Sequence, residues 1–253
     1  MNTVVIATTT FYKSRKDYRF PCADRMVKKA IADGHIVIIV DGSPNPEIKE
    51  YFLSLGAMVY DETMKGIGPS RRELYNHIRL FRVRHTAAPE IIQWLEPEKD
   101  DLIPFVPQII EPIKQGKAKI VVPRRTPAAW ESYPKFQRAS ERTANMAYKF
   151  ATGLDVDIFF GPVAFRCDML PYFLNCNPTE FGAADNYIQH YAPVFANRDF
   201  HRVASVEIDF RYPPGQREAE EGIDLRAMVE RRNEQLETLV DGYFKFSRHL
   251  GLR

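Results

Sequence analysis

The sequence predicts an α/β fold in which a mostly parallel central sheet is flanked by helices and followed by a C-terminal helical extension. Short runs rich in β-branched residues alternate along the chain with segments of helical periodicity. This alternation favours parallel strand–helix–strand crossovers, which leave a sheet covered on both faces. Residues 224–253 have helical periodicity alone and form the expected extension.

The first half of the chain contributes strands over residues 4–8, 35–40 and 57–60 and a run that begins at residue 91. Because ligands bind outside the carboxyl ends of parallel strands, the residues after each strand are candidates for a site. The expected helices are residues 24–33, 46–55 and 72–81, the first two ended by Gly34 and Gly56.

The second half continues the same alternation. The helix expected over residues 135–152 is amphipathic, and one of its faces is expected to pack into the core. This face is made of Phe136, Ala139, Thr143, Met146, Ala147 and Phe150. The expected elements are a helix over 102–114, a strand over 119–123, the amphipathic helix over 135–152, a strand–turn–strand over 157–166, a helix that opens at 180–186 and runs to 195, and a strand over 202–212.

The composition indicates a globular protein without a strong overall charge. In 253 residues, 35 basic and 33 acidic side chains leave a net charge of +2, which gives no field for a nucleic acid or a membrane surface. Cys22, Cys167 and Cys176 show neither metal-ligand nor disulfide spacing, which favours a reducing compartment. No signal peptide and no apolar run of membrane-spanning length is found. We therefore expect a cytoplasmic protein without an integral membrane segment.

The central feature is an acidic turn after the strand that begins at residue 91, where Glu96, Glu98, Asp100 and Asp101 follow an apolar run. These carboxylates repel one another, and a divalent cation is the simplest compensation. Mg²⁺ and Mn²⁺ prefer oxygen ligands and commonly join one or two carboxylates to the phosphates of a substrate. We interpret Glu96 and Glu98 as a metal and diphosphate site. A solvated acidic turn that caps the next helix is an equal alternative.

The loop over residues 8–20 follows the first expected strand and carries cations among aromatic side chains. A diphosphate can meet the cations there, although a solvated surface loop explains them equally well. Asp41, after the second strand, can accept a hydrogen bond from a base or a ribose, or be an ordinary turn residue. The cations of the loop are Lys13, Arg15, Lys16 and Arg19.

Residues 65–72 are a stronger indication of an anion site. Gly66 lies in a glycine-bearing turn, and Pro69 is set to begin the following helix. Free backbone N–H groups and the guanidinium groups of Arg71 and Arg72 can therefore face an anion together. The position of this turn after a third strand favours nucleotide or phosphate binding.

Two further candidates lie in the second half. Gly161 lets the backbone approach a ligand closely, while core packing is the alternative for the aromatic residues around it. Asp185 falls near the start of an expected helix, where its carboxylate can point into the cleft. It can serve there as a general base toward an acceptor hydroxyl, or only stabilise the helix dipole, and the sequence favours neither.

Taken in order, these motifs resemble the GT-A nucleotide-sugar glycosyltransferases, in particular the large family-two group and its polyprenyl-phosphate mannosyltransferase branch. The resemblance implies a Rossmann-like GT-A domain over residues 1–217 and a helical extension, residues 218–253, that packs on the domain or on a partner subunit. The segments that carry it are Val40-Asp41-Gly42-Ser43, Gly66-Ile67-Gly68-Pro69-Ser70-Arg71-Arg72, the acidic turn, Val121-Val122-Pro123-Arg124-Arg125 and Phe160-Gly161-Pro162-Val163-Ala164-Phe165-Arg166.

The resemblance also implies roles for individual residues. Glu96 and Glu98 take the place of the family's Asp-x-Asp motif and would bind Mn²⁺ or Mg²⁺, and Asp185 takes that of the acceptor-side base. Glutamate at both metal positions, with Pro97 between them, departs from the family pattern. The donor-binding candidates are Thr8, Asp41, Gly66, Arg71, Arg124, Arg211 and Arg217, and the acceptor-binding candidates are Gly161 and Arg166.

The function expected from this likeness is transfer of a hexose, of the mannose or glucose type, from a nucleoside-diphosphate sugar to a soluble hydroxyl acceptor. GDP-mannose is the first expectation for the donor and a UDP-hexose the second. The C-terminal helix is a candidate for a homo-oligomeric contact. A sugar nucleotidyltransferase is one alternative, but Thr8-Thr9-Thr10 lacks the glycine-rich, lysine-bearing loop of that class. A non-catalytic nucleotide-binding module is the other.

Overall fold

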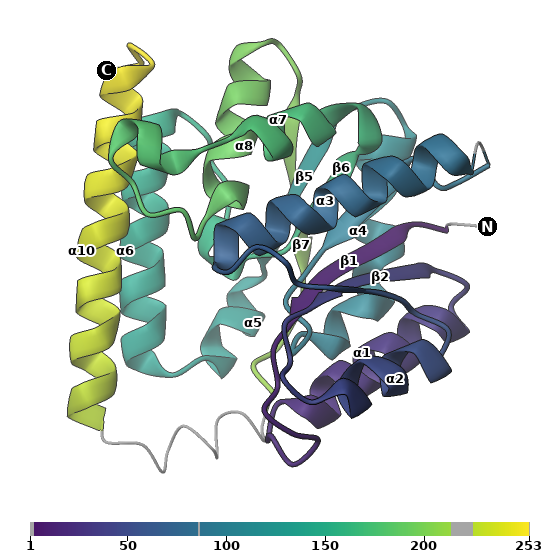
Figure 1. The fold of residues 1–253 in the computed structure, drawn as a ribbon. Coiled ribbons are helices and arrows are strands. Elements are labelled where there is room, and N and C mark those ends of the chain that lie inside the picture. The colour runs from purple at the N-terminus through teal and green to yellow at the C-terminus, as the bar shows by residue number, and fades with distance from the viewer. Residues whose placement is uncertain (1–2, 86, 214–224, 253) are drawn as a thin grey trace.

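The computed structural model describes residues 3–85, 87–213 and 225–252, and these residues form a seven-stranded sheet in the order β3-β2-β1-β4-β6-β5-β7 (Figure 1). Neighbouring strands are parallel except at β6, which is antiparallel to β4 and to β5. The mostly parallel sheet that the sequence predicts is therefore confirmed. The strands are β1 (Val5–Thr10), β2 (Ile36–Asp41), β3 (Met58–Asp61), β4 (Ile91–Trp94), β5 (Ile120–Arg125), β6 (Val163–Arg166) and β7 (Val203–Ile208).

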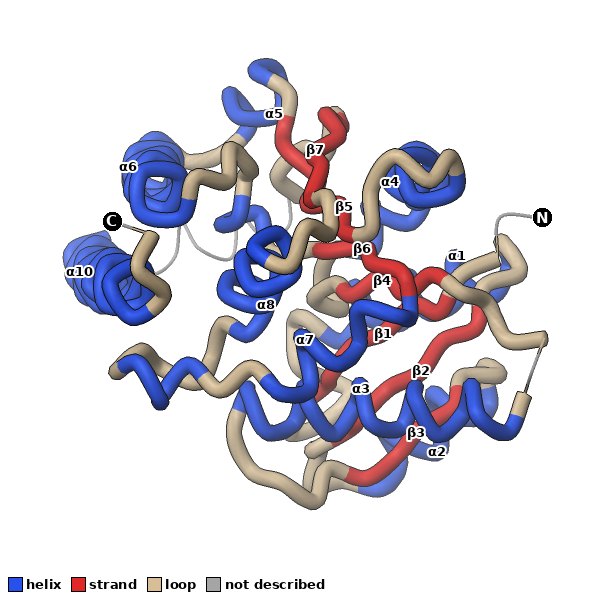
Figure 2. The backbone as a smooth tube through the Cα atoms, turned by 90° about the horizontal axis from the view of Figure 1, so that it is seen from above, coloured by secondary structure: helices blue, strands red, loops and turns tan. Residues whose placement is uncertain are grey.

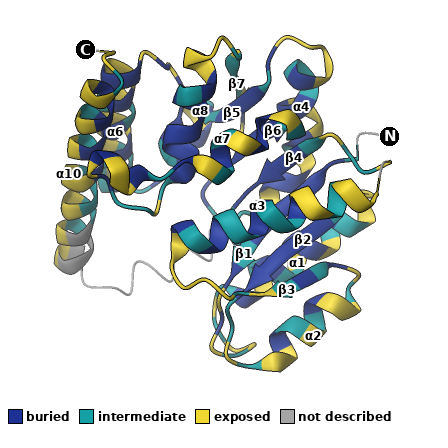
Figure 3. Cartoon of the chain, turned by 45° about the horizontal axis from the view of Figure 1, so that its top comes forward, coloured by how far each residue is buried: buried dark blue, intermediate teal, exposed yellow. Residues whose placement is uncertain are grey.

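Helices cover both faces of the sheet because successive strand residues point to opposite sides. Val5 and Ala7 pack into one core with α3, α7 and α8, whereas Val4 and Ile6 pack into another with α1, α2 and α4. The inner strands of the sheet are accordingly buried almost throughout (Figure 3), whereas the edge strands β3 and β7 each have only one buried residue. These helices are α1 (Phe20–Ala32), α2 (Pro46–Ser54), α3 (Ile67–Arg84), α4 (Val106–Lys114), α7 (Leu170–Asn175) and α8 (Ile188–Arg198).

The C-terminal helix packs on the same chain. α6 (Lys135–Thr152) and α10 (Leu225–His249) lie side by side in Figures 1 and 2. Leu239, Tyr243 and Phe246 of α10 are each no more than 2% exposed and join the core on the α3 side of the sheet. The extension thus forms a wall of the domain.

Several local predictions are wrong at boundaries set by proline and glycine. The helix expected over 102–114 is a 3-10 turn, η1 (Asp100–Phe105), followed by α4, because Pro104 lies inside the first turn and Pro107 suits only the start of a helix. The helix expected from 180–186 begins only at Ile188, after a separate turn that Gly182 ends in the left-handed conformation. Three 3-10 turns, η2 (Ile158–Phe160), η3 (Cys167–Met169) and η4 (Pro178–Phe181), and two short helices, α5 (Pro127–Ser132) and α7, were not expected.

The prediction of which face of α6 (Lys135–Thr152) packs into the core is also wrong. Met146 and Phe150 are 65% and 56% exposed, whereas Gln137, Glu141 and Tyr148 are buried. These polar side chains can be buried because distant residues satisfy them. Glu141 accepts a hydrogen bond from Arg125, and the Tyr148 hydroxyl donates to the carbonyl oxygen of His190.

Candidate active site

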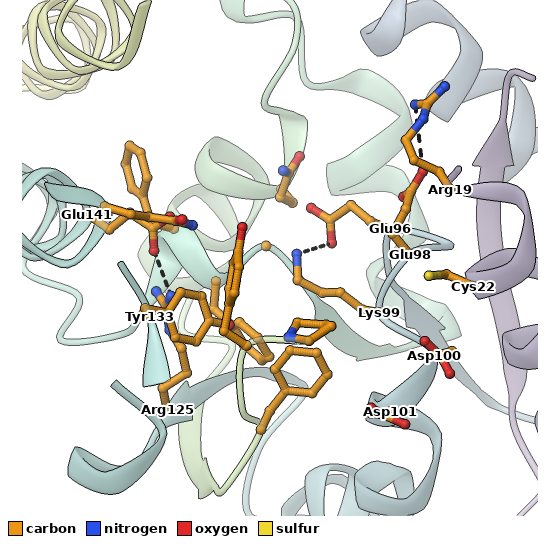
Figure 4. Close-up of a pocket in the computed structure, with 18 of the residues that line it drawn as sticks. Arg19, Cys22, Glu96, Glu98, Lys99, Asp100, Asp101, Arg125, Tyr133 and Glu141 are labelled. Atoms are coloured by element: carbon orange, nitrogen blue, oxygen red, sulfur yellow. Dashed lines mark hydrogen bonds and ion pairs between the residues drawn. The ribbon is translucent and has the colours of Figure 1, made fainter. Parts of the chain in front are cut away.

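A cavity of about 660 Å³ lies at the edge of the sheet where the parallel strands end. Residues that follow β4, β5 and β7 line it, together with residues that precede the antiparallel β6. Side chains from α1, α6, α8 and α10 close its sides. Figure 4 shows Arg125 and Glu141 on one side of this cavity and Glu96, Glu98 and Lys99 on the other. The position is the one expected for a ligand site in a parallel sheet.

The acidic turn forms one wall of the cavity. Glu96 and Glu98 both line it, and each already has a basic partner. Glu96 Oε2 lies 2.9 Å from Lys99 Nζ, and Glu98 Oε1 lies 3.7 Å from Arg19 Nη1. Burial raises the pKa of the Glu98 carboxyl above its ordinary value, and Arg19 opposes this increase.

The two aspartates of the acidic turn attach the turn to α1 through ion pairs. Asp100 is 2% exposed and lies 2.9 Å from Arg25 Nε and 3.0 Å from Lys29 Nζ, both on α1. Lys29 also lies 2.7 Å from Asp101. All four carboxylates therefore have basic partners within the chain, so a metal ion is not needed merely to offset their repulsion.

Gly161 makes room for Glu96. Its φ of 99° lies in the region that favours glycine, and a Cβ added there would lie 2.4 Å from Glu96 Oε1. The glycine lines the cavity, as the sequence suggested, and its observed contact is with the acidic turn rather than with an acceptor subsite.

Arg125, rather than Arg124, faces the cavity. Its guanidinium is buried, donates to both carboxylate oxygens of Asp157 at 2.8 Å and to Glu141 at 2.6 Å, and lies 3.6 Å from the centre of the Trp130 ring. Arg124 points to the other side of the strand and donates through Nε to the Ser205 hydroxyl at 3.1 Å. The alternation of side chains along β5 explains the difference and is a signal that the sequence analysis missed.

Two other arginine candidates do not line the cavity, and a third lies outside the residues that the structure describes. Arg166 ends the antiparallel β6 and pairs in register with Ile91, the first residue of β4, so it stands at the opposite edge of the sheet. Its assignment to an acceptor site is therefore wrong. Arg211 is exposed, lies 3.1 Å from Asp209 and lines an adjoining cavity, which shares Phe210 and Tyr212 with the first. Arg217 lies outside the described residues.

Thr8 lies inside β1, two residues before the strand ends, and Asp41 is the last residue of β2; neither lines the cavity. The Thr8 side chain is fully buried, and its hydroxyl donates to the Leu95 carbonyl oxygen at 2.8 Å, which ties β1 to β4. Asp41 Oδ1 accepts hydrogen bonds from the Thr10 hydroxyl at 2.7 Å and the Ser43 hydroxyl at 2.6 Å. Within the described residues, the hydrogen bonds that Asp41 accepts all end on Oδ1.

The glycine-bearing turn leads into α3, as expected, with Gly66 at φ 113° before the first helical residue. Arg71 does not reach the cavity. Its guanidinium lies 4.1 Å from the centre of the Trp94 ring and donates to the Asn186 carbonyl oxygen at 2.9 Å. Burial lowers the pKa of this guanidinium, and Glu96 opposes the decrease.

Asp185 also lies outside the cavity lining. Both of its carboxylate oxygens accept hydrogen bonds from Arg72, with Nη1 2.7 Å from Oδ1. The residue sits in the segment before α8 and not inside a helix. The geometry therefore brings Asp185 against α3, and its role as a base stays a prediction.

Sequence reasoning missed the side chains of α8 and α10. His190 lines the cavity, and its Nδ1 lies 2.7 Å from the Tyr243 hydroxyl of α10. Arg232 and Gln235 of α10 also line the cavity; Gln235 donates to the Tyr187 hydroxyl at 2.6 Å, and Arg232 lies 3.7 Å from Glu141. Polar residues on a terminal helix are normally read as its solvent face, so no local pattern indicated this arrangement.

Two features are absent from the part of the chain that the structure describes. No group of three or more His, Cys, Asp or Glu side chains in this part of the chain is arranged to hold a metal ion. No helix among the described residues is long and apolar enough to cross a membrane.

The chain has the GT-A fold of nucleotide-sugar glycosyltransferases, as the sequence predicts. It is similar to solved structures of glucosyl-3-phosphoglycerate synthase from Mycobacterium tuberculosis. One matches with a TM-score of 0.56 at 13% identity and covers 95% of this chain and 80% of that chain. The complex with Mn²⁺, UDP-glucose and phosphoglyceric acid matches with a TM-score of 0.51 at 13% identity, over 95% and 79% of the two chains. No family model and no curated protein sequence matches. At such identity the likeness concerns the fold alone.

Proposed function

We propose that the chain is a hexosyltransferase that moves a hexose from a nucleoside-diphosphate sugar to a hydroxyl acceptor. The observation that carries the proposal is the position of Glu96 and Glu98. They stand at the carboxyl end of β4, in the wall of a cavity of about 660 Å³, on a GT-A fold. This is the place where a parallel sheet binds its ligand.

The side chains present fit a divalent cation. Glu96 and Glu98 supply the carboxylate oxygens that Mg²⁺ and Mn²⁺ prefer, and such ions are usually held by one or two carboxylates together with substrate phosphates. The similar synthase was solved with Mn²⁺ and UDP-glucose, which supports the same kind of cofactor. When bound, the cation would neutralise charge on the departing nucleoside diphosphate.

The donor side of the proposed site lies at the ends of β1 to β3. Asp41 is placed to accept a hydrogen bond through Oδ2, because its contacts within the described residues use Oδ1. For the donor itself, the sequence resemblance favours GDP-mannose, whereas the UDP-glucose bound to the similar synthase favours a UDP-hexose. Both donors belong in the assay.

A non-catalytic nucleotide-binding module is the second candidate, and one observation favours it. Lys99 and Arg19 already offset the charges of Glu96 and Glu98, so the acidic turn is stable without a metal ion. Such a module would bind a nucleoside diphosphate without cleaving a sugar nucleotide.

Calorimetry and a hydrolysis assay separate these candidates. UDP and GDP are titrated into the protein with and without Mn²⁺, and release of UDP or GDP from UDP-glucose and GDP-mannose is then followed. We expect the wild type to bind a nucleotide more tightly with Mn²⁺ and to hydrolyse one of the two donors slowly. We expect E96Q and E98Q to lose the Mn²⁺-strengthened binding and the hydrolysis. E237Q, at an exposed position on α10, is the matched control. Binding without hydrolysis would favour the module, and no binding of either nucleotide would reject both candidates.

A further inference from the structure

We propose that Lys99 is a diphosphate-binding residue, whose ammonium balances Glu96 in the free protein and contacts the diphosphate of the donor once it binds. The inference rests on the proposed function and adds a cationic residue that no motif indicated. Lys99 lines the cavity beside Glu96 and Glu98.

The contacts of Lys99 hold its ammonium at the cavity wall. Nζ lies 2.9 Å from Glu96 Oε2 (Figure 4). It lies 5.5 Å from the centre of the Phe160 ring, and the side chain is 23% exposed. A carboxylate on one side and an aromatic face on the other both favour a positive charge there. The four-carbon stem of lysine lets the ammonium turn to a new partner without any change of the backbone.

The backbone of the acidic turn places Lys99 beside Glu96. The Lys99 N–H donates to the Glu96 carbonyl oxygen at 3.0 Å, which closes a tight turn over residues 96–99. Pro97 is buried inside this turn and fixes its first bend, and Gly161 leaves room for the Glu96 carboxylate against the facing backbone. The Glu-Pro-Glu-Lys sequence therefore builds one unit that presents two carboxylates and a cation to the same cavity.

Charge balance indicates that the Lys99 ammonium is needed at the diphosphate once a metal ion is bound. Two carboxylates offset the full charge of a divalent ion, so a metal held by Glu96 and Glu98 leaves the negative charge of a diphosphate without an equal counter-charge. Lys99 and Arg19 are the basic side chains paired with these carboxylates. Arg19 is more constrained, because it also bonds to Asp17 and to the Phe11 carbonyl oxygen. Of the two, Lys99 is therefore better placed to move to the diphosphate.

The test is calorimetric titration of UDP and GDP into wild type, K99M, K99R and K117M, once with Mn²⁺ and once with EDTA. K99M keeps the stem and removes the charge, and Lys117 is an exposed lysine that does not line the cavity. We expect K99M to weaken nucleotide binding about tenfold or more in both buffers, as loss of a charge-assisted contact does. K99R should recover part of the affinity, and K117M should match wild type.

The outcomes separate this inference from the proposed function. Unchanged nucleotide affinity in K99M would show that Lys99 is only a counter-ion of Glu96 and would overturn the inference alone. If the wild type binds neither UDP nor GDP in either buffer, the inference and the proposed function are overturned together. Thermal unfolding of each variant confirms that the compared proteins are folded.

Discussion

Arg72 on α3 and Asp185 in the segment before α8 form a two-point ion pair, with both carboxylate oxygens bonded to the guanidinium. Gly68, one turn earlier on α3, permits this contact, since a Cβ added there would lie 1.9 Å from the Asp185 carbonyl oxygen. The Asp185 segment is thereby docked on α3. A residue that the sequence suggests as a base is held, in the structure, by a basic partner.

We expect R72M and D185N to destabilise the protein through the same interaction. Each should lower the free energy of unfolding by about 1–2 kcal/mol, and the double variant should lose little more than either single one. Urea unfolding of the four proteins measures this coupling. The alternative, that Asp185 is the acceptor-side base, requires a different result: D185N would abolish turnover and keep donor binding and stability, while R72M would remain active.

Gly161 and Gly153 offer a matched pair of substitutions for the position of Glu96. Both have positive φ, 99° and 78°, but a Cβ at Gly153 would meet nothing within 4 Å. G161A and G153A should therefore share a backbone cost of about 1–2 kcal/mol. Only G161A should displace Glu96 and weaken Mn²⁺-dependent nucleotide binding, by about tenfold. Urea unfolding and calorimetry measure the two effects, and equal nucleotide affinity in both variants would contradict this account of Gly161.

Arg125 and Arg124 give a second matched pair on one strand. R125M leaves Asp157 and Glu141 buried without their shared cation, and breaking a buried pair in this way costs about 3–5 kcal/mol. R124M removes a partly exposed pair with Asp155 and should cost no more than about 1 kcal/mol. Thermal unfolding should show a melting temperature roughly 10 °C lower for R125M and nearly unchanged for R124M. Similar losses in the two variants would reject the buried network as a source of stability.

The fold could be predicted because its signals are local. The bounds of α6, Lys135–Thr152, agree with the predicted helix, because Pro134 precedes it and Gly153 ends it in the left-handed conformation. The crossover rule then places the ends of the parallel strands at one edge, and this brings Glu96 and Glu98 to the cavity as expected.

Most of the site could not be predicted, because it depends on strand direction and on distant partners. A strand pattern does not reveal that β6 runs antiparallel, and this reversal carries Arg166 to the far edge of the sheet. Helical periodicity does not reveal that Glu141 is buried, since its partner Arg125 comes from another element. The same holds for His190, whose partner Tyr243 lies more than fifty residues later, on α10.

His190 is the group from which we expect a distinct pH dependence of stability. The ring is 2% exposed, Nδ1 lies 2.7 Å from the Tyr243 hydroxyl, and the rings of Phe159 and Tyr187 lie 5.6 Å and 5.0 Å away between centres. Burial lowers the pKa of His190 from its ordinary 6.5 to about 3, with a smaller contribution from the positive charge of Arg71. The ring is therefore neutral in the folded protein at neutral pH.

Between pH 6.5 and about pH 3, His190 takes up a proton in the unfolded chain but not in the folded protein. Because the unfolded state binds more protons, the free energy of unfolding should fall as the pH is lowered through this window, by up to about 1.4 kcal/mol per pH unit. Urea unfolding at a series of pH values measures the slope, and H190N should show a shallower one than wild type. H249N, at an exposed position of α10, should keep the wild-type slope. A slope in H190N equal to that of wild type would mean that the ring is not buried in its neutral form.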